Sequence, residues 1–164
     1  MKTTVLNPKI CKLIEERLLD EMTAFYTYLS IANWCKSIGF MKAGDYFAKE
    51  SDDELGHAKM LTEFLVGWND IPDLPVIAKP KLEFKSLLEA IETAYKIELS
   101  LLEKYNETCE TIEDMDLSVY QFLTKFLEIQ TSSVAEYSDK LNLLENCKTD
   151  DKFQMLMLEE QLFT

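Results

Sequence analysis

The sequence predicts an all-α fold, a four-helix bundle with one long crossover and a short fifth helix. Only 4 glycines and 4 prolines occur in 164 residues, and the long stretches between them are rich in residues that favour helix. Four of these stretches carry apolar residues at the 3.6-residue helical period. Three of the four prolines fall within residues 67–80, which therefore cannot be helical. We expect residues 1–164 to form a single domain, since this length suits one sizeable core.

The helix boundaries follow from local start and stop signals. Asn7-Pro8 is an N-cap followed by proline at the first helical position, and Gly39 is a stop signal. The Pro-containing stretch is longer than a tight turn needs, so we expect it to run from one end of the bundle to the other. The predicted helices cover residues of about 8–37, 41–66, 84–112, 117–146 and 151–162.

Composition and charge limit the classes of partner. The formal net charge of −13 argues against nucleic acid or an anionic membrane as a partner and is compatible with cations as ligands. The 4 cysteines form no C-x-x-C pair, which favours reduced thiols. The first residues contain no apolar segment of the length that a signal peptide needs. We therefore expect a cytoplasmic location.

The second predicted helix carries the clearest chemical signal. Glu50, Glu54 and His57, the only histidine, share one face with apolar residues. A buried carboxylate needs a positively charged partner or a metal, and neither Lys nor Arg occurs on that face. Glu54-x-x-His57 also has the i, i+3 spacing with which two side chains of one helix bind one metal inside a bundle.

Each of the other long helices also has polar residues on its apolar face. Glu21 lies on that face in the first helix and Glu98 in the third. Gln130 and Ser133, both neutral, hold the corresponding place in the fourth. Polar residues therefore interrupt the apolar faces of all four long helices.

Four short motifs, one in each long helix, resemble the signatures of the ferritin family, most nearly the bacterial non-haem ferritins. They are Glu21 with Tyr28-Leu29, Asp53-Glu54-Leu55-Gly56-His57, Tyr95-Lys96-Ile97-Glu98, and Phe126-Leu127-Glu128-Ile129-Gln130. The resemblance covers nearly the whole chain. It implies a ferritin-like domain that assembles into a hollow homo-oligomeric shell of two dozen subunits, a 24-mer cage. Such a shell oxidises Fe(II) with dioxygen or peroxide at a di-iron ferroxidase centre in each subunit and stores ferric mineral, and no haem is expected.

The resemblance also implies roles for individual side chains. The first iron is held by Glu21, Glu54 and His57, the bridge between the irons is Glu54, and the second iron is held by Glu98. Gln130 lies on the oxidant side of the second iron, and Tyr28 is the nearby aromatic residue that lends an electron. Carboxylate oxygens with one imidazole suit iron in both oxidation states.

The fourth helix departs from the family pattern. Ser133 stands where the bacterial non-haem ferritins carry a glutamate ligand of the second iron, so we expect an attenuated ferroxidase. Ile129 and Ser132 replace acids of an accessory third site, of which Asp53 alone is retained. Glu136, one turn beyond Ser133, is a candidate replacement ligand.

Two other readings compete with an active ferroxidase. In one, the chain is a cage subunit with a weak or single-iron centre, which binds and nucleates iron without efficient oxidation; the replacement at Ser133 favours it. The other is a di-iron peroxidase of the rubrerythrin type, which is disfavoured because a second Glu-x-x-His and a Cys-x-x-C pair are missing from the sequence. Mini-ferritins are disfavoured too, because they lack a fifth helix.

Overall fold

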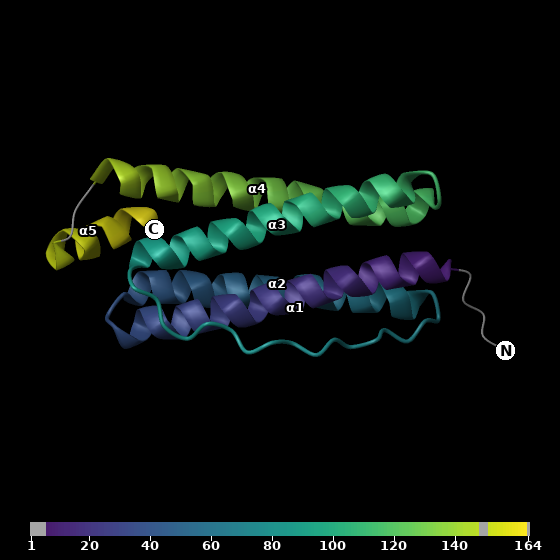
Figure 1. Ribbon diagram of the computed structural model, residues 1–164, viewed down its shortest axis with the longest axis horizontal. Helices are drawn as coiled ribbons and strands as arrows, with labels where there is room; N and C mark the ends of the chain where they lie inside the picture. The colour runs from purple at the N-terminus through teal and green to yellow at the C-terminus, as the bar shows by residue number, and fades with distance from the viewer. Residues whose placement is uncertain (1–5, 148–150, 164) are drawn as a thin grey trace.

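The computed structural model describes residues 6–147 and 151–163, and the helices in these ranges form two antiparallel hairpins. Figure 1 shows α1 and α2 side by side, α3 and α4 forming the second hairpin, and α5 beyond one end of the bundle. The all-α prediction is confirmed, with α1 at Pro8–Ser37, α2 at Met41–Gly67, α3 at Leu87–Glu113, α4 at Leu117–Cys147 and α5 at Lys152–Leu162.

Both ends of α1 are closed by the signals that the sequence contains. The side chain of Asn7 accepts a hydrogen bond from the backbone N–H of Lys9 at 2.9 Å. At the other end Gly39 has φ of 96°, a left-handed conformation that costs glycine little. The backbone N–H of Phe40 then donates to the carbonyl of Cys35 at 2.9 Å, which ends the helix and turns the chain back.

The third helix begins later than the sequence predicts. Its N-cap is Ser86, whose hydroxyl accepts the backbone N–H of Glu89 at 3.2 Å, so the first helical residue is Leu87. The predicted start near residue 84 is therefore wrong. Phe84 is buried before the helix begins, and its ring packs edge-on against Trp34 with ring centroids 5.4 Å apart. The hydrophobicity of Phe84 reflects this contact rather than a helical position.

The crossover between α2 and α3 runs along α1 (Figure 1). Near its start, the backbone N–H of Asp73 donates to the carboxylate of Glu15 at 2.9 Å. Near its end, the hydroxyl of Ser30 donates to the carbonyl of Lys81 at 2.5 Å. Glu15 and Ser30 are four turns apart on α1, so the prediction of an end-to-end crossover is confirmed. This connection makes α3 antiparallel to α1.

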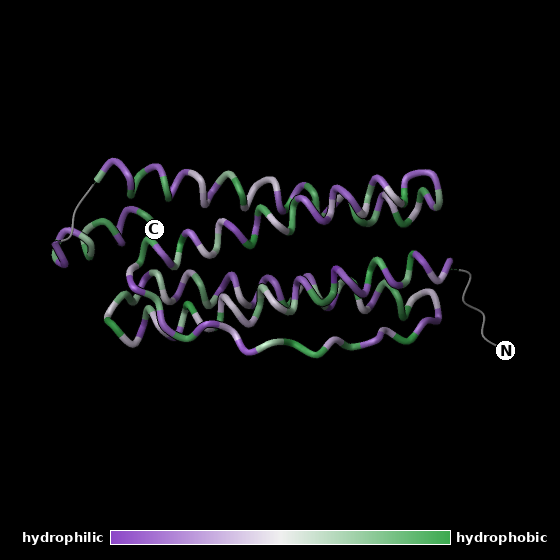
Figure 2. Tube along the Cα trace, viewed as in Figure 1, coloured by the Kyte–Doolittle hydropathy of each residue, from purple (hydrophilic) through white to green (hydrophobic). Residues whose placement is uncertain are grey.

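Apolar side chains fill the space between the two hairpins. Figure 2 shows hydrophobic and hydrophilic residues alternating along the helices, as amphipathic helices require. The polar residues predicted on the inner faces of the four long helices are buried as well, with exposed fractions of 0% for Glu21, 4% for Glu54, 0% for Glu98 and 0% for Gln130. The 4 cysteines are free, and none of the described helices is long and apolar enough to cross a membrane.

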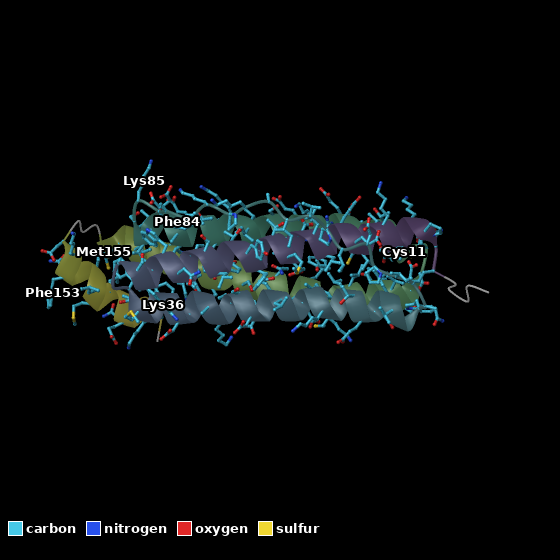
Figure 3. The ribbon with its side chains drawn as sticks, turned by 90° about the horizontal axis from the view of Figure 1, so that it is seen from below. Cys11, Lys36, Phe84, Lys85, Phe153 and Met155 are labelled. Carbon is cyan, nitrogen blue, oxygen red and sulfur yellow. The ribbon has the colours of Figure 1, made fainter. Side chains whose placement is uncertain are left out.

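The short helix α5 is attached to the start of α2. Glu159 accepts the backbone N–H of Ala43 at 2.8 Å, and Lys42 forms an ion pair with Glu160. Figure 3 places Phe153 and Met155 at the end of the bundle that also holds Phe84, with Cys11 at the opposite end. A groove of about 1060 Å³ lies between α5 and the neighbouring ends of α1, α3 and α4. The outer side of α5 is largely apolar and exposed, with Phe153 at 71%, Leu156 at 44% and Met157 at 56%.

Candidate metal centre

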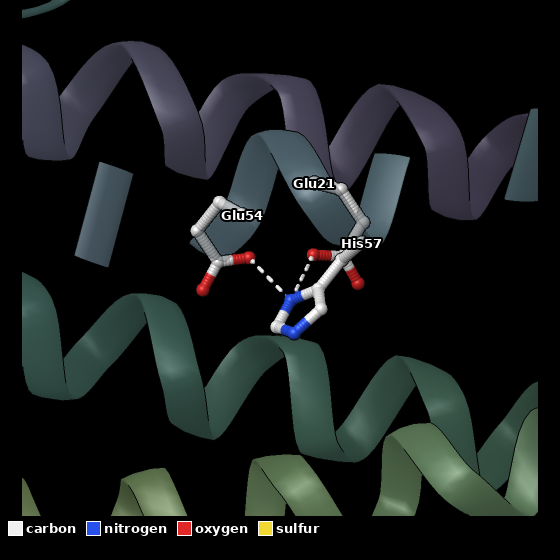
Figure 4. A group of neighbouring side chains, drawn as sticks. All are labelled: Glu21, Glu54 and His57. Atoms are coloured by element: carbon white, nitrogen blue, oxygen red, sulfur yellow. Dashed lines mark hydrogen bonds and ion pairs between the residues drawn. The ribbon is translucent and has the colours of Figure 1, made fainter. Parts of the chain in front are cut away.

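Glu21 of α1 meets Glu54 and His57 of α2 inside the bundle (Figure 4). The Nδ1 atom of His57 lies 3.2 Å from Oε2 of Glu54 and 3.4 Å from Oε2 of Glu21. One ligand atom from each of the three residues lies within 4.8 Å of the others. Adjacent ligands of a cation bound at about 2.1 Å are about 3 Å apart, which is close to the separation of Nδ1 of His57 from each carboxylate.

The helix geometry explains this arrangement. Glu54 and His57 are three residues apart on α2 and therefore point to the same side. Glu21 reaches them from the neighbouring antiparallel helix. The ring of Phe126, on α4, stands edge-on to His57 with centroids 5.9 Å apart and limits access of water from that side. The side chain of His57 is only 14% exposed.

The charges of this group partly compensate one another. Burial on its own lowers the pKa of His57, but the adjacent carboxylates of Glu21 and Glu54 outweigh it and raise that pKa to about 10. Burial tends to raise the pKa of Glu21, yet contact with His57 brings it below its ordinary value. Burial raises the pKa of Glu54 well above its ordinary value. A protonated imidazole thus occupies the place that a metal ion takes when it binds.

Two buried tyrosines connect α1 and α3 in a crosswise manner. The hydroxyl of Tyr28 on α1 donates to Glu98 on α3, and that of Tyr105 on α3 donates to Glu21 on α1. The carboxylate and the tyrosine are seven residues apart in both helices, so the antiparallel pair can form both bonds. No role in the site was predicted for Tyr105 from the sequence. The spacing shared by Glu21 with Tyr28 and Glu98 with Tyr105 was the sequence signal for its role.

Glu98 and Gln130 form a second polar group, from α3 and α4. Both are fully buried, and burial, with a further contribution from the charge of Glu50, raises the pKa of Glu98 to about 7. Within residues 6–147 and 151–163, Oε2 of Glu98 and both amide atoms of Gln130 have no hydrogen-bond partner. Leaving such atoms unpaired costs about 1–3 kcal/mol each, so they are suited to a ligand.

The structure places Glu136 outside these groups. Its carboxylate is half-exposed and lies 2.8 Å from Nζ of Lys140. It also accepts a hydrogen bond from the hydroxyl of Tyr46 at 2.8 Å. Ser133 is partly buried on α4, and Asp53 is exposed, with an ion pair to Lys49 at 2.7 Å. Glu136 therefore needs to break two contacts before it can act as a ligand.

Comparisons with known proteins agree with this architecture. Residues 11–147 match the family described as the ferritin-like domain. A probable bacterial non-heme ferritin-like protein of Haemophilus influenzae is 30% identical over 144 residues, covering 85% of this chain and 87% of the relative. The bacterial non-heme ferritin of Campylobacter jejuni is 28% identical over 85% of this chain and 86% of its own length. Among solved structures, an open pore ferritin from Archaeoglobus fulgidus superimposes with a TM-score of 0.89 at 25% identity, covering 96% of this chain and 97% of the other.

Proposed function

Since the chain belongs to the ferritin family, we propose that it takes up ferrous iron, oxidises it at a di-iron ferroxidase centre inside each subunit, and stores the ferric product in a cytoplasmic cage. The observation that carries this proposal is the buried group of Glu21, Glu54 and His57, in which two acids and an imidazole face one another within 4.8 Å. The similar bacterial proteins are named as non-heme ferritins, which supports iron as the substrate.

The first position is suited to oxidation of iron as well as to binding. Ferrous iron that enters it displaces the proton on Nδ1 of His57 and gains the two carboxylates as ligands. Those carboxylates attract a triply charged ion more strongly than a doubly charged one, in surroundings that contain little water. The site therefore favours loss of an electron from iron to dioxygen or peroxide.

The second position uses Glu98, with Glu54 as the bridge and Gln130 beside it. The hydroxyl of Tyr28 donates to Glu98, which supports a role for this tyrosine as an electron donor near the second iron. Ser133 contributes a hydroxyl, a poor ligand at neutral pH. We therefore propose that the second position is weaker than the first.

Aerobic iron loading of the full-length protein tests this function. The parent protein should take up added ferrous iron into a soluble ferric core, whereas the double variant Glu21→Gln, Glu54→Gln should lose rapid uptake. Asp52→Asn is the matched control, because it removes one exposed charge from the same helix. Equal loading of parent and double variant would place the chemistry elsewhere.

A closed shell of two dozen subunits is the second part of the proposal. The exposed apolar side chains of Phe153, Leu156 and Met157 on α5 support it, because an isolated subunit would leave them in water. Solution scattering should show a hollow particle. A compact monomer of 19.0 kDa would contradict it. Deletion of residues 152–164 should weaken the shell and leave the four-helix bundle folded.

A cage subunit that binds and nucleates iron without efficient oxidation is the alternative. Ser133 and the contacts that hold Glu136 favour it, because both reduce the ligands of the second position. Anaerobic binding with slow oxidation in air would select this function over the ferroxidase.

A further inference from the structure

Glu50 is a partly buried carboxylate for which the site described above gives no role. It lies on α2 one turn before Glu54 and shares its face. The hydroxyl of Tyr137, on α4, donates to its Oε2 atom at 3.2 Å. No Lys or Arg of the described chain forms an ion pair with Glu50. Burial, and next the charge of Glu136, raise the pKa of Glu50 above its ordinary value. A carboxylate in such surroundings is suited to a cation.

The contacts of Glu50 connect it, through two tyrosines, to Glu98 of the second position. Tyr137, which donates to Glu50, is stacked on Tyr28 with ring centroids 6.3 Å apart and an angle of 13° between the rings. Tyr28 in turn donates to Glu98. The two carboxylates are therefore bound by the hydroxyls of one stacked pair of tyrosines. The charge of Glu50 also contributes to the raised pKa of both Glu98 and Tyr28.

Along the length of the bundle, Gln130 lies between His57 and Glu50. It follows Phe126, the neighbour of His57, by about one turn on α4 and precedes Tyr137 by about two turns. Its amide is fully buried, and so is the second oxygen of Glu98; neither group has a partner there among the described residues. The amide oxygen of Gln130 and the second oxygen of Glu98 are therefore suitable ligand atoms for a divalent cation between α2, α3 and α4.

We propose that Glu50 supplies the carboxylate that the second metal position lacks at Ser133. A ferrous ion there is held by Glu50, Glu54 and Glu98, with the amide oxygen of Gln130 as a further ligand. Glu50 and Glu54 are four residues apart on one helix, so both can reach the same ion. Tyr137 is the positioning residue for Glu50. This inference rests on the proposed function, since it assigns a ligand to the second position of the same centre.

Glu50 suits this role better than Glu136. Glu136 is held by a lysine and by Tyr46, whereas a single tyrosine hydroxyl holds Glu50.

Anaerobic titration of the assembled full-length protein with ferrous iron, followed by calorimetry, tests the inference. Glu50→Gln keeps an acceptor for Tyr137 and should weaken the second binding event at least about tenfold, while the first changes by less than about twofold. Asp52→Asn should change neither event. In the Glu50→Gln background, the further change Ser133→Glu should restore the second event, which a purely structural role of Glu50 does not predict.

Each remaining outcome has a definite meaning. An unchanged second event in Glu50→Gln, with the first intact, overturns the inference and leaves the proposed function in place. Loss of the second event in Glu136→Gln but not in Glu50→Gln overturns it as well and assigns the ligand to Glu136. Absence of any ferrous binding by the parent protein overturns the proposed function together with the inference.

Discussion

The two hairpins of the bundle carry the same framework but different chemistry. α1 and α3 each contribute a buried glutamate and a tyrosine seven residues later, and each tyrosine donates to the glutamate of the other helix. The difference lies in α2 and α4. The former carries Glu54 and His57 three residues apart, and the latter carries Gln130 and Ser133 at the same spacing.

The tyrosine–glutamate pairs of α1 and α3 are thus common to both hairpins, whereas the polar side chains that α2 and α4 add to them differ. In the first hairpin the imidazole and the acids compensate one another without a metal, so a metal ion has to compete with a proton. In the second, Glu98 has no such partner, and Oε2 of Glu98 and both amide atoms of Gln130 lack hydrogen bonds within the described chain. Oε2 of Glu21 in the first hairpin also lacks a hydrogen bond, but it lies 3.4 Å from Nδ1 of His57. Despite this competition the first position is expected to bind more tightly, since imidazole nitrogen is a good ligand for iron.

The largest expected effect comes from removing the imidazole. His57→Ala leaves Glu21 and Glu54 facing each other without a nitrogen ligand. Rapid ferrous oxidation should fall at least about tenfold, or about 1.4 kcal/mol of barrier. Stopped-flow absorbance after mixing with aerobic ferrous iron measures this rate, with Asp52→Asn as control. Parent-like kinetics in His57→Ala would mean that the hairpin of α1 and α2 does not contain the centre.

The pH dependence of binding should differ between the two positions. A metal needs the neutral imidazole of His57, whose pKa in the metal-free protein is about 10, so affinity at the first position rises with pH. One proton displaced per ion gives about a tenfold gain between about pH 7 and about pH 8. The pKa of Glu98 is about 7, so affinity at the second position falls most steeply below that pH, where this ligand becomes protonated. Anaerobic ferrous titrations at several pH values test this, and parallel curves for the two positions would contradict it.

Restoring a carboxylate in α4 should make the two hairpins more alike. Ser133→Glu adds a ligand to the second position, and we expect its affinity for ferrous iron to rise by about three- to tenfold. The first position should be unaffected. Ser133→Gln is the matched control, because it has nearly the same size and no charge. Equal gains in both variants would show that side-chain volume rather than a carboxylate is responsible.

The smallest expected effect concerns stability. Tyr105→Phe removes the hydroxyl that donates to Glu21, whose pKa is below its ordinary value and which is therefore ionised at neutral pH. Tyr28→Phe removes the donor to Glu98, which is partly protonated there. We expect losses of about 2 kcal/mol and about 1 kcal/mol, because hydrogen bonds to charged groups are the stronger ones. Thermal unfolding of the metal-free variants compares the two losses. A larger loss in Tyr28→Phe would indicate that Glu98 rather than Glu21 is the more fully ionised carboxylate.

Much of the fold was predictable because periodicity and capping act locally. The boundaries of α1 follow from Asn7-Pro8 and Gly39, and the burial of Glu21, Glu54 and Glu98 follows from helical phase. The start of α3 could not be predicted from the sequence, because a tertiary contact with Trp34 buries Phe84 outside the helix.

The partners of the site residues were harder to predict than their positions. Helical phase places Glu50 and Glu136 near the bundle, but it does not show that Tyr137 binds the former or that Lys140 and Tyr46 bind the latter. Such contacts depend on the rotation and separation of packed helices, which a single sequence does not specify.

The asymmetry of the two positions is tested most directly by anomalous scattering from a crystal soaked anaerobically in ferrous iron near neutral pH. We predict a strong peak bounded by Glu21, Glu54 and Nδ1 of His57, and a weaker peak between Glu50, Glu54 and Glu98. A stronger peak beside Glu98, or no peak between Glu21 and His57, would contradict it.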